Sequence, residues 1–210
     1  MFDKYRRMRI KVYIFVVLVL VLFAVPIAAQ AQEQSAQSRE YQIKAAFLYN
    51  FINFVDWPEE KFADTNEPII IGIIGEDPFG DVFEPIKNKK VEGRGIVIKQ
   101  FKSFEELKKS SGEDNAESCR KIEALRKCHL LFICAEEKNF KEIINSVRDH
   151  NVLTVGDMEG FLESGGIINF LMEERKVRFE INVAAAKRAG LKMRSKLLRL
   201  AKRVVEEDTT

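Results

Sequence analysis

The sequence predicts a single-domain α/β protein with a mostly parallel sheet, an antiparallel hairpin at the sheet edge, and helices on both faces. Three observations lead to this prediction. Four β-type segments alternate with helical segments between 68 and 155, as in a parallel sheet. Segment 68–74 is almost continuously apolar, which is typical of a strand covered on both faces. Two further strand-like segments, 167–172 and 177–181, are joined by a short polar link, as in a hairpin.

Residues 1–31 have the composition of an export signal. A basic start precedes an apolar run from Val12 to Val25, and Ala29 and Ala31 are the small residues that a signal peptidase recognises. We therefore expect cleavage after Ala31 and a mature periplasmic protein that does not span the membrane. An uncleaved anchor is the alternative, although the run is marginally short for a span. The periplasm has no ATP, NADH or GTP pool, which argues against nucleotide-driven enzymes.

The charge of the mature chain gives no indication of a nucleic-acid partner. The signal holds five of the 34 basic and one of the 32 acidic residues, which leaves 29 basic and 31 acidic residues and a net charge of −2. The stretch 187–203 is locally basic. We interpret it as a solvated helix face. The alternative is a surface that binds acidic polymers or lipid headgroups.

The mature chain begins with a polar leader, 32–39, which we expect to be flexible, and continues as one α/β domain over 40–205. A helix is predicted from Tyr41, because apolar residues recur every three or four positions. Trp57-Pro58 ends this helix, since a residue before proline avoids helical backbone angles. The side chains expected to face the sheet are Ile43, Phe47, Phe51 and Phe54.

The β and α segments that follow are predicted from their turn and capping residues. Asp77-Pro78 opens a short helix that runs toward Lys87, and Ser103 to Glu106 forms a capping box. A third helix is expected from about Glu137 to Arg148. The four predicted strands are 68–74, 95–101, 130–135 and 152–155.

The C-terminal part departs from the alternating pattern. After the hairpin, Asn182 is expected to cap a helix that continues through Ala189 and ends at Gly190. A last amphipathic helix is predicted from Ser195 to Val205.

No catalytic or metal-binding set can be assembled from the sequence, and we expect neither enzyme activity nor a cofactor. Acidic residues follow three predicted strands, at Glu76/Asp77, Glu136/Glu137 and Asp157, so they share the sheet edge at which ligands usually bind. We interpret them as helix caps and soluble loop residues, with a cation site as the alternative. The segment 74–80 lacks the lysine and glycines of phosphate-binding loops.

Charged and polar residues on the hairpin give candidate ligand-binding positions. Arg178 and Glu180 alternate with the apolar residues of 177–181, so they share one strand face. If that face is covered, both charges must be paired, and we expect them to pair with neighbouring helices. A ligand site that includes Arg178, Glu180 and Asn169 is the alternative.

Four segments of the chain, in order, resemble the YfiR family of exported bacterial proteins. They are YQIKAAFLYNFINFVDWPEE (41–60), IGIIGEDPFGDVF (71–83), CHLLFIC (128–134), and the stretch 153–202 with its Gly-Asp, Gly-Gly and Arg-Phe-Glu-Ile-Asn sequences. The resemblance implies a compact, dimerising α/β domain. It also implies a periplasmic inhibitor of an inner-membrane diguanylate cyclase, which lowers cyclic-di-GMP and biofilm formation. Genes of this family also occur beside other membrane sensors, so a sensor kinase is the second candidate partner.

Two other functions remain open beside this one. The runner-up is a periplasmic small-molecule binding or sensor module, and an exported hydrolase comes third. For the inhibitor, the aromatic first helix supplies partner-binding candidates, Tyr49 and Trp57, because exposed aromatic side chains mark interaction sites.

The chain has three cysteines, where the characterised family pattern has two pairs. Export makes a disulfide possible, and we predict one between Cys119 and Cys128, with Cys134 as a buried thiol. A helical path between the two would separate them by about 13.5 Å, and a bridge needs about 4.4–6.8 Å. The bridge therefore requires that the segment between them turn back.

Overall fold

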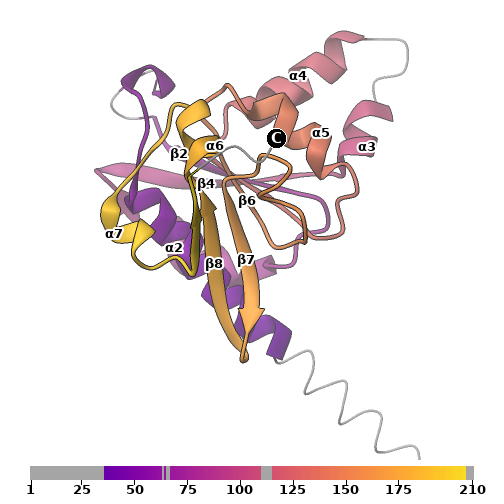
Figure 1. Ribbon diagram of the computed structural model, residues 1–210. Coiled ribbons are helices and arrows are strands. Elements are labelled where there is room, and N and C mark those ends of the chain that lie inside the picture. The colour runs from indigo at the N-terminus through magenta and orange to yellow at the C-terminus, as the bar shows by residue number, and fades with distance from the viewer. Residues whose placement is uncertain (1–35, 63, 65–66, 110–114, 207–210) are drawn as a thin grey trace, which may run out of the picture. The chain divides into compact units, whose positions relative to one another are not determined.

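The computed structural model describes residues 36–62, 64, 67–109 and 115–206 (Figure 1). The predicted export signal and the start of the leader therefore lie outside the described residues. The chain divides into two units at Glu40/Tyr41, and the second unit contains the sheet and both hydrophobic clusters. None of the described helices is both long enough and apolar enough to cross a membrane.

An eight-stranded sheet organises the second unit, and its order is β10-β8-β7-β6-β5-β2-β4-β3. The strands β2, β4, β5, β6 and β7 run parallel, with β5 between β2 and β6. This confirms the predicted fold class. The bounds are β2 Ile69–Ile74, β3 Lys90–Val91, β4 Arg94–Phe101, β5 Leu130–Ile133, β6 Leu153–Gly156, β7 Ile168–Glu173, β8 Lys176–Asn182 and β10 Arg203–Val205.

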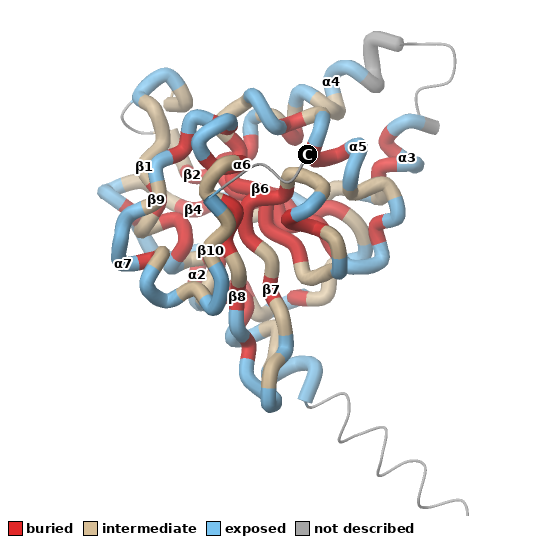
Figure 2. Tube along the Cα trace, in the orientation of Figure 1, coloured by how far each residue is buried: buried red, intermediate tan, exposed pale blue. Residues whose placement is uncertain are grey.

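The central strands are buried from both sides, as the continuous apolar run of β2 indicated. Every residue of β2, β5 and β6 is buried, and Figure 2 shows these strands in red at the centre of the sheet. Alternate residues of β2 point to opposite faces, so Ile71 and Ile73 join one hydrophobic cluster and Ile70 and Ile74 join the other.

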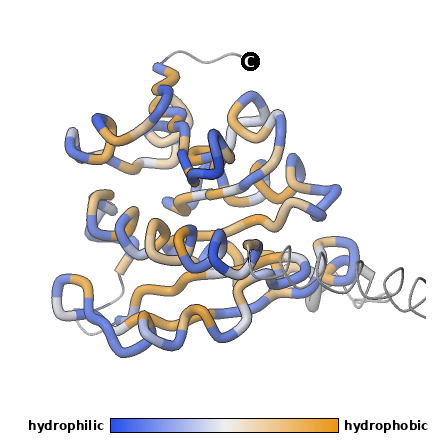
Figure 3. Tube along the Cα trace, turned by 90° about the horizontal axis from the view of Figure 1, so that it is seen from below, coloured by the Kyte–Doolittle hydropathy of each residue, from blue (hydrophilic) through white to orange (hydrophobic). Residues whose placement is uncertain are grey.

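Helices cover both faces, as predicted. One cluster packs under residues 41–53 of the first helix, η2 (Gly80–Phe83), α2 (Glu84–Lys87), α6 (Val183–Arg188) and α7 (Ser195–Leu198). The other packs under α3 (Phe104–Lys109), α4 (Asn115–Arg126) and α5 (Phe140–Val147). In the view of Figure 3, hydrophilic and hydrophobic stretches alternate along the coiled parts of the trace, as expected for helices with one buried side.

The hairpin belongs to the main sheet but is not its edge. β7 and β8 pair antiparallel, and the two-residue turn between them places Glu174 and Arg175 at positive φ angles of 48° and 62°. β10 pairs in parallel with the outer side of β8 and forms the edge instead. We predicted a helix from Ser195 to Val205, but the helix ends at Leu198. The prediction was wrong for the residues after it, because the β-branched Val204 and Val205 pair with β8.

The first helix buries a partly different set of side chains from the one that we predicted. Its described part begins at 36, and within the second unit the buried apolar side chains are Ala45, Leu48, Phe51 and Ile52. Ile43 is 42% exposed, whereas Phe47 and Phe54 are half-buried. The small Ala45 allows close approach to the sheet, which the pattern of large residues did not indicate.

Local capping signals were confirmed in part. Asn182 caps α6 by accepting a hydrogen bond from the Ala185 N–H at 2.9 Å. Gly190 follows with a φ of 69°. The Ser103 hydroxyl oxygen accepts from Glu106 N–H at 3.3 Å. Asp77 instead binds Phe79 N–H in a turn, and the first helical turn begins at Gly80.

A second, two-stranded sheet was not predicted. β1 (Val55–Asp56) pairs antiparallel with β9 (Lys192–Met193), and η1 (Glu59–Lys61) follows β1. Arg194 holds this corner together, because its guanidinium contacts Asp56 at 2.6 Å and Glu92 at 3.2 Å.

Candidate functional site

Acidic side chains gather at the carboxyl edge of the parallel strands. The strand order β4-β2-β5-β6-β7 is that of flavodoxin-like folds, which bind ligands at this edge. Asp77 follows β2, Glu137 follows β5 and Asp157 follows β6. Burial raises the pKa of the nearby Cys134 thiol to about 12, with these carboxylates adding to the effect.

Two of these carboxylates form turn and capping contacts, as we had interpreted. The Glu137 carboxylate accepts from Phe104 N–H at 3.0 Å and from Asn139 N–H at 3.2 Å. Asp77 accepts from Phe79 N–H at 2.8 Å and from the Gln100 side chain. Among the residues that the structure describes, no group of three or more His, Cys, Asp or Glu side chains could hold a metal ion.

The third carboxylate belongs to a buried ion pair that the sequence did not predict. Lys44 Nζ, from the first helix, lies 2.6 Å from Asp157 Oδ2, and the two side chains are 4% and 6% exposed. The Tyr41 hydroxyl donates to the same oxygen at 3.3 Å, and Lys44 Nζ lies 4.4 Å from the Tyr41 ring centroid. Asp157 Oδ1 is buried and accepts no hydrogen bond within the described part of the chain. A positive side chain of the protein itself thus occupies this edge.

The loop that carries Asp157 is built around one aromatic ring. A Cβ atom on Gly156 would lie 2.6 Å from the Phe161 ring, and one on Gly166 would lie 2.3 Å from it. Only glycine fits at both positions, and the fully buried Phe161 fills the space between them. The Gly-Asp and Gly-Gly sequences therefore position Asp157 opposite Lys44.

A second group of buried polar residues lies at the amino ends of the strands. His129 is 1% exposed, and its Nδ1 accepts a hydrogen bond from Ile70 N–H at 3.1 Å. Burial, followed by the charges of Lys61 and Arg94, lowers the His129 pKa to about 4. Burial also lowers the Lys61 pKa to about 8. Lys61 Nζ donates to the Arg126 and His150 carbonyls, both at 2.8 Å.

Aromatic stacking completes this group. The Phe62 ring lies between the His129 ring, at 4.8 Å, and the Arg94 guanidinium, at 4.0 Å. Trp57 packs edge-on against His129, with ring centroids 6.1 Å apart. We interpret the group as a polar part of the core, because each of these side chains packs against or bonds to a neighbour in it.

The cysteines do not form the predicted bridge in this structure. Cys119, Cys128 and Cys134 are free thiols; Cys119 is exposed and the other two are buried. α4 continues without interruption from Asn115 to Arg126, so the segment between Cys119 and Cys128 does not turn back. Burial raises the Cys128 pKa to about 12, and its thiol donates to the Ala124 carbonyl at 3.5 Å.

The two candidate partner-binding aromatics have different environments. Tyr49 is half-buried, and Lys89 Nζ lies 4.7 Å from its ring centroid. Trp57 is also half-buried, but its indole N–H donates to the Asn151 carbonyl at 3.1 Å, which fixes the ring against the body of the domain. Tyr49 is therefore the better positioned of the two for a contact with another molecule.

The three candidate ligand-binding residues have separate environments on the β7–β8 pair. Asn169 and Glu180 are directly opposite each other in the β7–β8 pair. Asn169 Oδ1 accepts from Met158 N–H at 3.2 Å, and Glu180 pairs with Arg203 of β10 at 2.7 Å. Arg178 is exposed on the same strand face. This face is open to solvent at Arg178, and the partner of Glu180 comes from a strand rather than from a helix.

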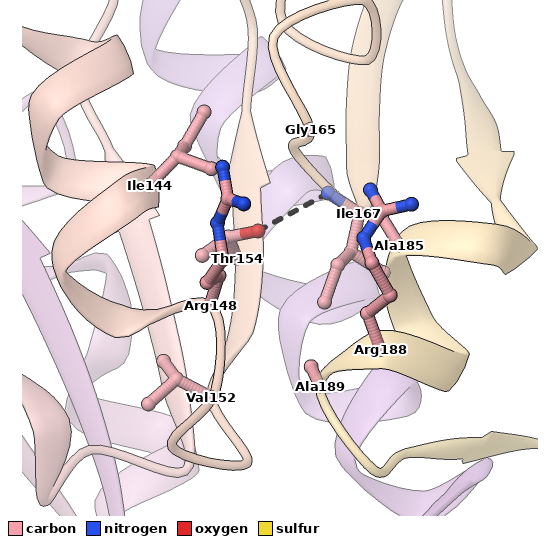
Figure 4. A pocket seen from close by; sticks show the side chains of 9 residues that line it. All are labelled: Ile144, Arg148, Val152, Thr154, Gly165, Ile167, Ala185, Arg188 and Ala189. Carbon is pink, nitrogen blue, oxygen red and sulfur yellow. Dashed lines mark hydrogen bonds between the residues drawn. The ribbon is translucent and has the colours of Figure 1, made fainter. Parts of the chain in front are cut away.

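A small pocket lies between α5 and α6, and Figure 4 shows its lining. Arg148 and Arg188 flank it, and the hydrogen bond from Ile167 N–H to the Thr154 hydroxyl oxygen, 3.1 Å long, crosses its floor. Its volume of about 10 Å³ holds roughly one water molecule. Pockets for small-molecule ligands are typically about 300–1,000 Å³, so this pocket does not support the sensor alternative.

Comparison with known proteins identifies one family. A family model described as DUF4154, YfiR/HmsC-like, matches residues 41–202. No curated protein matches the chain.

Two solved structures are similar at low identity. A conserved domain protein from Vibrio cholerae has a TM-score of 0.43 and 10% identity, over 64% of this chain and 54% of that chain. The ABC domain from Streptococcus pneumoniae, in complex with L-Trp, has a TM-score of 0.44 and 12% identity, over 65% and 56%. The chain spans little more than half the length of either structure, and similarity at this level carries no argument about function.

Proposed function

The chain belongs to the YfiR/HmsC-like family, and from this premise we propose that it binds the periplasmic part of an inner-membrane signalling protein and holds that protein inactive. The family match over residues 41–202 is the observation that carries the proposal, because it includes both core clusters and every strand of the sheet except the edge strand β10. Membership of this family points to a periplasmic regulator rather than to an enzyme.

We infer that the partner is a diguanylate cyclase, so that the protein lowers cyclic-di-GMP and biofilm formation. Several polar side chains of the domain, among them Glu137, Asp77 and Lys61, are engaged by neighbouring groups of the protein, which is compatible with regulation by binding. We also propose that the protein acts as a homodimer after removal of residues 1–31.

We place the partner contact at the first helix, around Tyr49. Its ring is half-buried and carries a cation–π contact with Lys89, so it offers an aromatic surface and a positive charge together. Such amphipathic aromatic side chains are common in binding hot spots. Arg178, exposed on the hairpin, is a second position that a partner could contact.

Expression with and without the protein tests the proposal in a bacterial strain that holds the inner-membrane partner. We expect the protein to lower cyclic-di-GMP several-fold. A photo-crosslinking residue placed at Tyr49 should capture an inner-membrane protein. The same residue at Lys141, which is exposed on α5, serves as the matched control and should capture none. If the cyclic-di-GMP level is unchanged and the captured protein is a sensor kinase, the regulatory role is supported but the diguanylate cyclase is not the partner. No capture from Tyr49 and no change in cyclic-di-GMP would contradict the proposal as a whole.

A further inference from the structure

The basic stretch near the C-terminus separates in the structure into paired and unpaired cations. Residues 187–203 contain eight basic and no acidic residues. Three of the eight form ion pairs with distant acids: Arg194 with Asp56, Lys202 with Glu173, and Arg203 with Glu180. These three charges hold β9 and β10 in place, so they do not form an available surface.

Three other cations gather where β9 leads into α7. Lys192, Lys196 and Arg199 are exposed, and none of them forms an ion pair with any residue in the described part of the chain. Lys196 Nζ lies 5.2 Å from the ring centroid of the half-buried Phe54, so this exposed charge sits over an aromatic ring at the surface of the domain. β9 pairs with β1, and α7 lies close to them at one side of the fold (Figure 2).

An apolar side chain accompanies these charges. Leu200, directly after α7, is 58% exposed, more than the other exposed large hydrophobic residues Ile43, Val97 and Met172. A single exposed leucine needs no explanation on its own. Its position next to three unpaired cations gives a surface that combines positive charge with an apolar group that can insert. We call Lys192, Lys196, Arg199 and Leu200 the basic corner.

We propose that the basic corner docks the protein on an anionic membrane surface, with the three cations near lipid phosphates and Leu200 among the upper acyl chains. Lys192 of β9, Lys196 of α7 and Arg199 are close to the exposed Leu200 along the chain. A fluid layer of anionic headgroups can match this arrangement without a fixed geometry, whereas a protein partner needs complementary shape. The inference goes beyond the proposed function, because it requires no protein partner.

The expected binding is weak, reversible and dependent on salt. Each Lys or Arg near an anionic membrane strengthens partitioning by about five-fold, so three cations together contribute roughly a hundred-fold. Because the attraction falls off within a Debye length, raising the salt concentration to about 0.5 M should remove most of it.

Vesicle sedimentation tests the proposal with residues 32–210, which contain every described element of the fold. The vesicles are phosphatidylcholine alone, or phosphatidylcholine with one third phosphatidylglycerol. The test variants are the triple variant Lys192→Gln/Lys196→Gln/Arg199→Gln and the single variant Leu200→Ser. The matched control, Lys127→Gln/Lys138→Gln/Lys141→Gln, removes three exposed charges elsewhere. Thermal melting of each variant checks that it remains folded.

We expect binding to the anionic vesicles only, a roughly hundred-fold loss in the triple variant, and no comparable loss in the control. Leu200→Ser should weaken binding several-fold at every salt concentration. Equal binding to neutral vesicles, no binding of the wild type, or an equal loss in the control would overturn the proposal. If the wild type ignores vesicles but the triple variant loses the inner-membrane partner, the corner is a protein contact and the membrane proposal is wrong. Because the vesicles contain no protein, this result is independent of the proposed regulatory function.

Discussion

Burying Lys44 against Asp157 removes two charges from water, and the residues around them determine whether this stabilises the fold. Asp157 Oδ2 has two partners, Lys44 and Tyr41, whereas Oδ1 has none within the described residues. Such a pair contributes little net stability compared with apolar residues, but removing one member leaves an uncompensated charge. The pair therefore specifies how the first helix lies on the sheet more than it stabilises the domain.

Replacement of one member should accordingly be costly. We expect Asp157→Asn to lower the free energy of unfolding by about 3–5 kcal/mol, because the buried Lys44 loses the carboxylate charge that lies 2.6 Å from its Nζ. The double variant Lys44→Met/Asp157→Leu should recover most of this loss. Lys202→Met removes the exposed pair with Glu173 and serves as the control, with an expected loss of about 1 kcal/mol or less. Urea unfolding measures all three, and an equal effect of Asp157→Asn and the control would contradict the expectation.

His129 makes the stability of the domain depend on pH. Its folded pKa of about 4 lies below the unfolded value of about 6.5, so the unfolded chain takes up a proton first as the pH falls. Stability is therefore lost from pH 6.5 down to about pH 4, by up to about 3 kcal/mol from this residue. Urea unfolding across this range should show the loss in the wild type.

His129→Gln provides the comparison, because glutamine keeps an acceptor for Ile70 N–H and does not titrate. The chain has two histidines, so the remaining imidazole signal in His150→Gln belongs to His129 and its NMR titration should have a midpoint near pH 4. A midpoint near 6.5 would show that His129 is not buried in this way.

Among the strands, those with a clear apolar pattern in their own sequence were predictable. The very short strands that form only by pairing with a distant segment were not. β2, β5 and β6 follow from continuous apolar runs, since only a strand covered on both faces needs them. β1, β9 and β10 are two or three residues long and exist because a distant segment pairs with them. The acidic residues at the carboxyl edge were located by strand order. Lys44 was missed, because its ion pair depends on how the first helix crosses the sheet.

The β7–β8 hairpin turn holds two non-glycine residues in a strained backbone conformation. Glu174 and Arg175 both have positive φ angles, a conformation that asparagine and glycine adopt more readily. We expect Glu174→Asn/Arg175→Gly to raise the free energy of unfolding by about 1 kcal/mol. Thermal unfolding monitored by circular dichroism measures the change.

The β3–β4 turn supplies the matched control. Gly93 has a φ of 85°, and a Cβ added there would meet nothing within 4 Å. Gly93→Ala should therefore lower the free energy of unfolding by about 1 kcal/mol through backbone strain alone. If the hairpin variant is no more stable than the wild type, or if Gly93→Ala has no effect, the turns are not strained as described.

For the whole molecule, the two hydrophobic clusters share one sheet, so they should unfold together. Ile71 and Ile70 are neighbours in β2 but belong to opposite clusters. We expect Ile143→Ala, on the α5 side, to lower the free energy of unfolding by about 2–5 kcal/mol. Fluorescence of the single tryptophan, Trp57, which packs against the other cluster, should report the same shift as circular dichroism.

Phe51→Ala, in the other cluster, should give the same coincidence of the two probes. If the fluorescence transition stays in place while the circular dichroism transition moves, the two faces unfold independently.

The position of β10 affects how the protein is made. β10 covers the outer edge of β8 and comes last among the described elements. A nascent or truncated chain that stops before Arg203 can complete the rest of the sheet, yet it presents β8 as an open edge with a row of unpaired backbone groups. Such edges recruit other chains. Residues 203–205 thus protect the β8 edge from pairing with other chains. We expect chaperones to bind the nascent chain until these residues have been synthesised and paired.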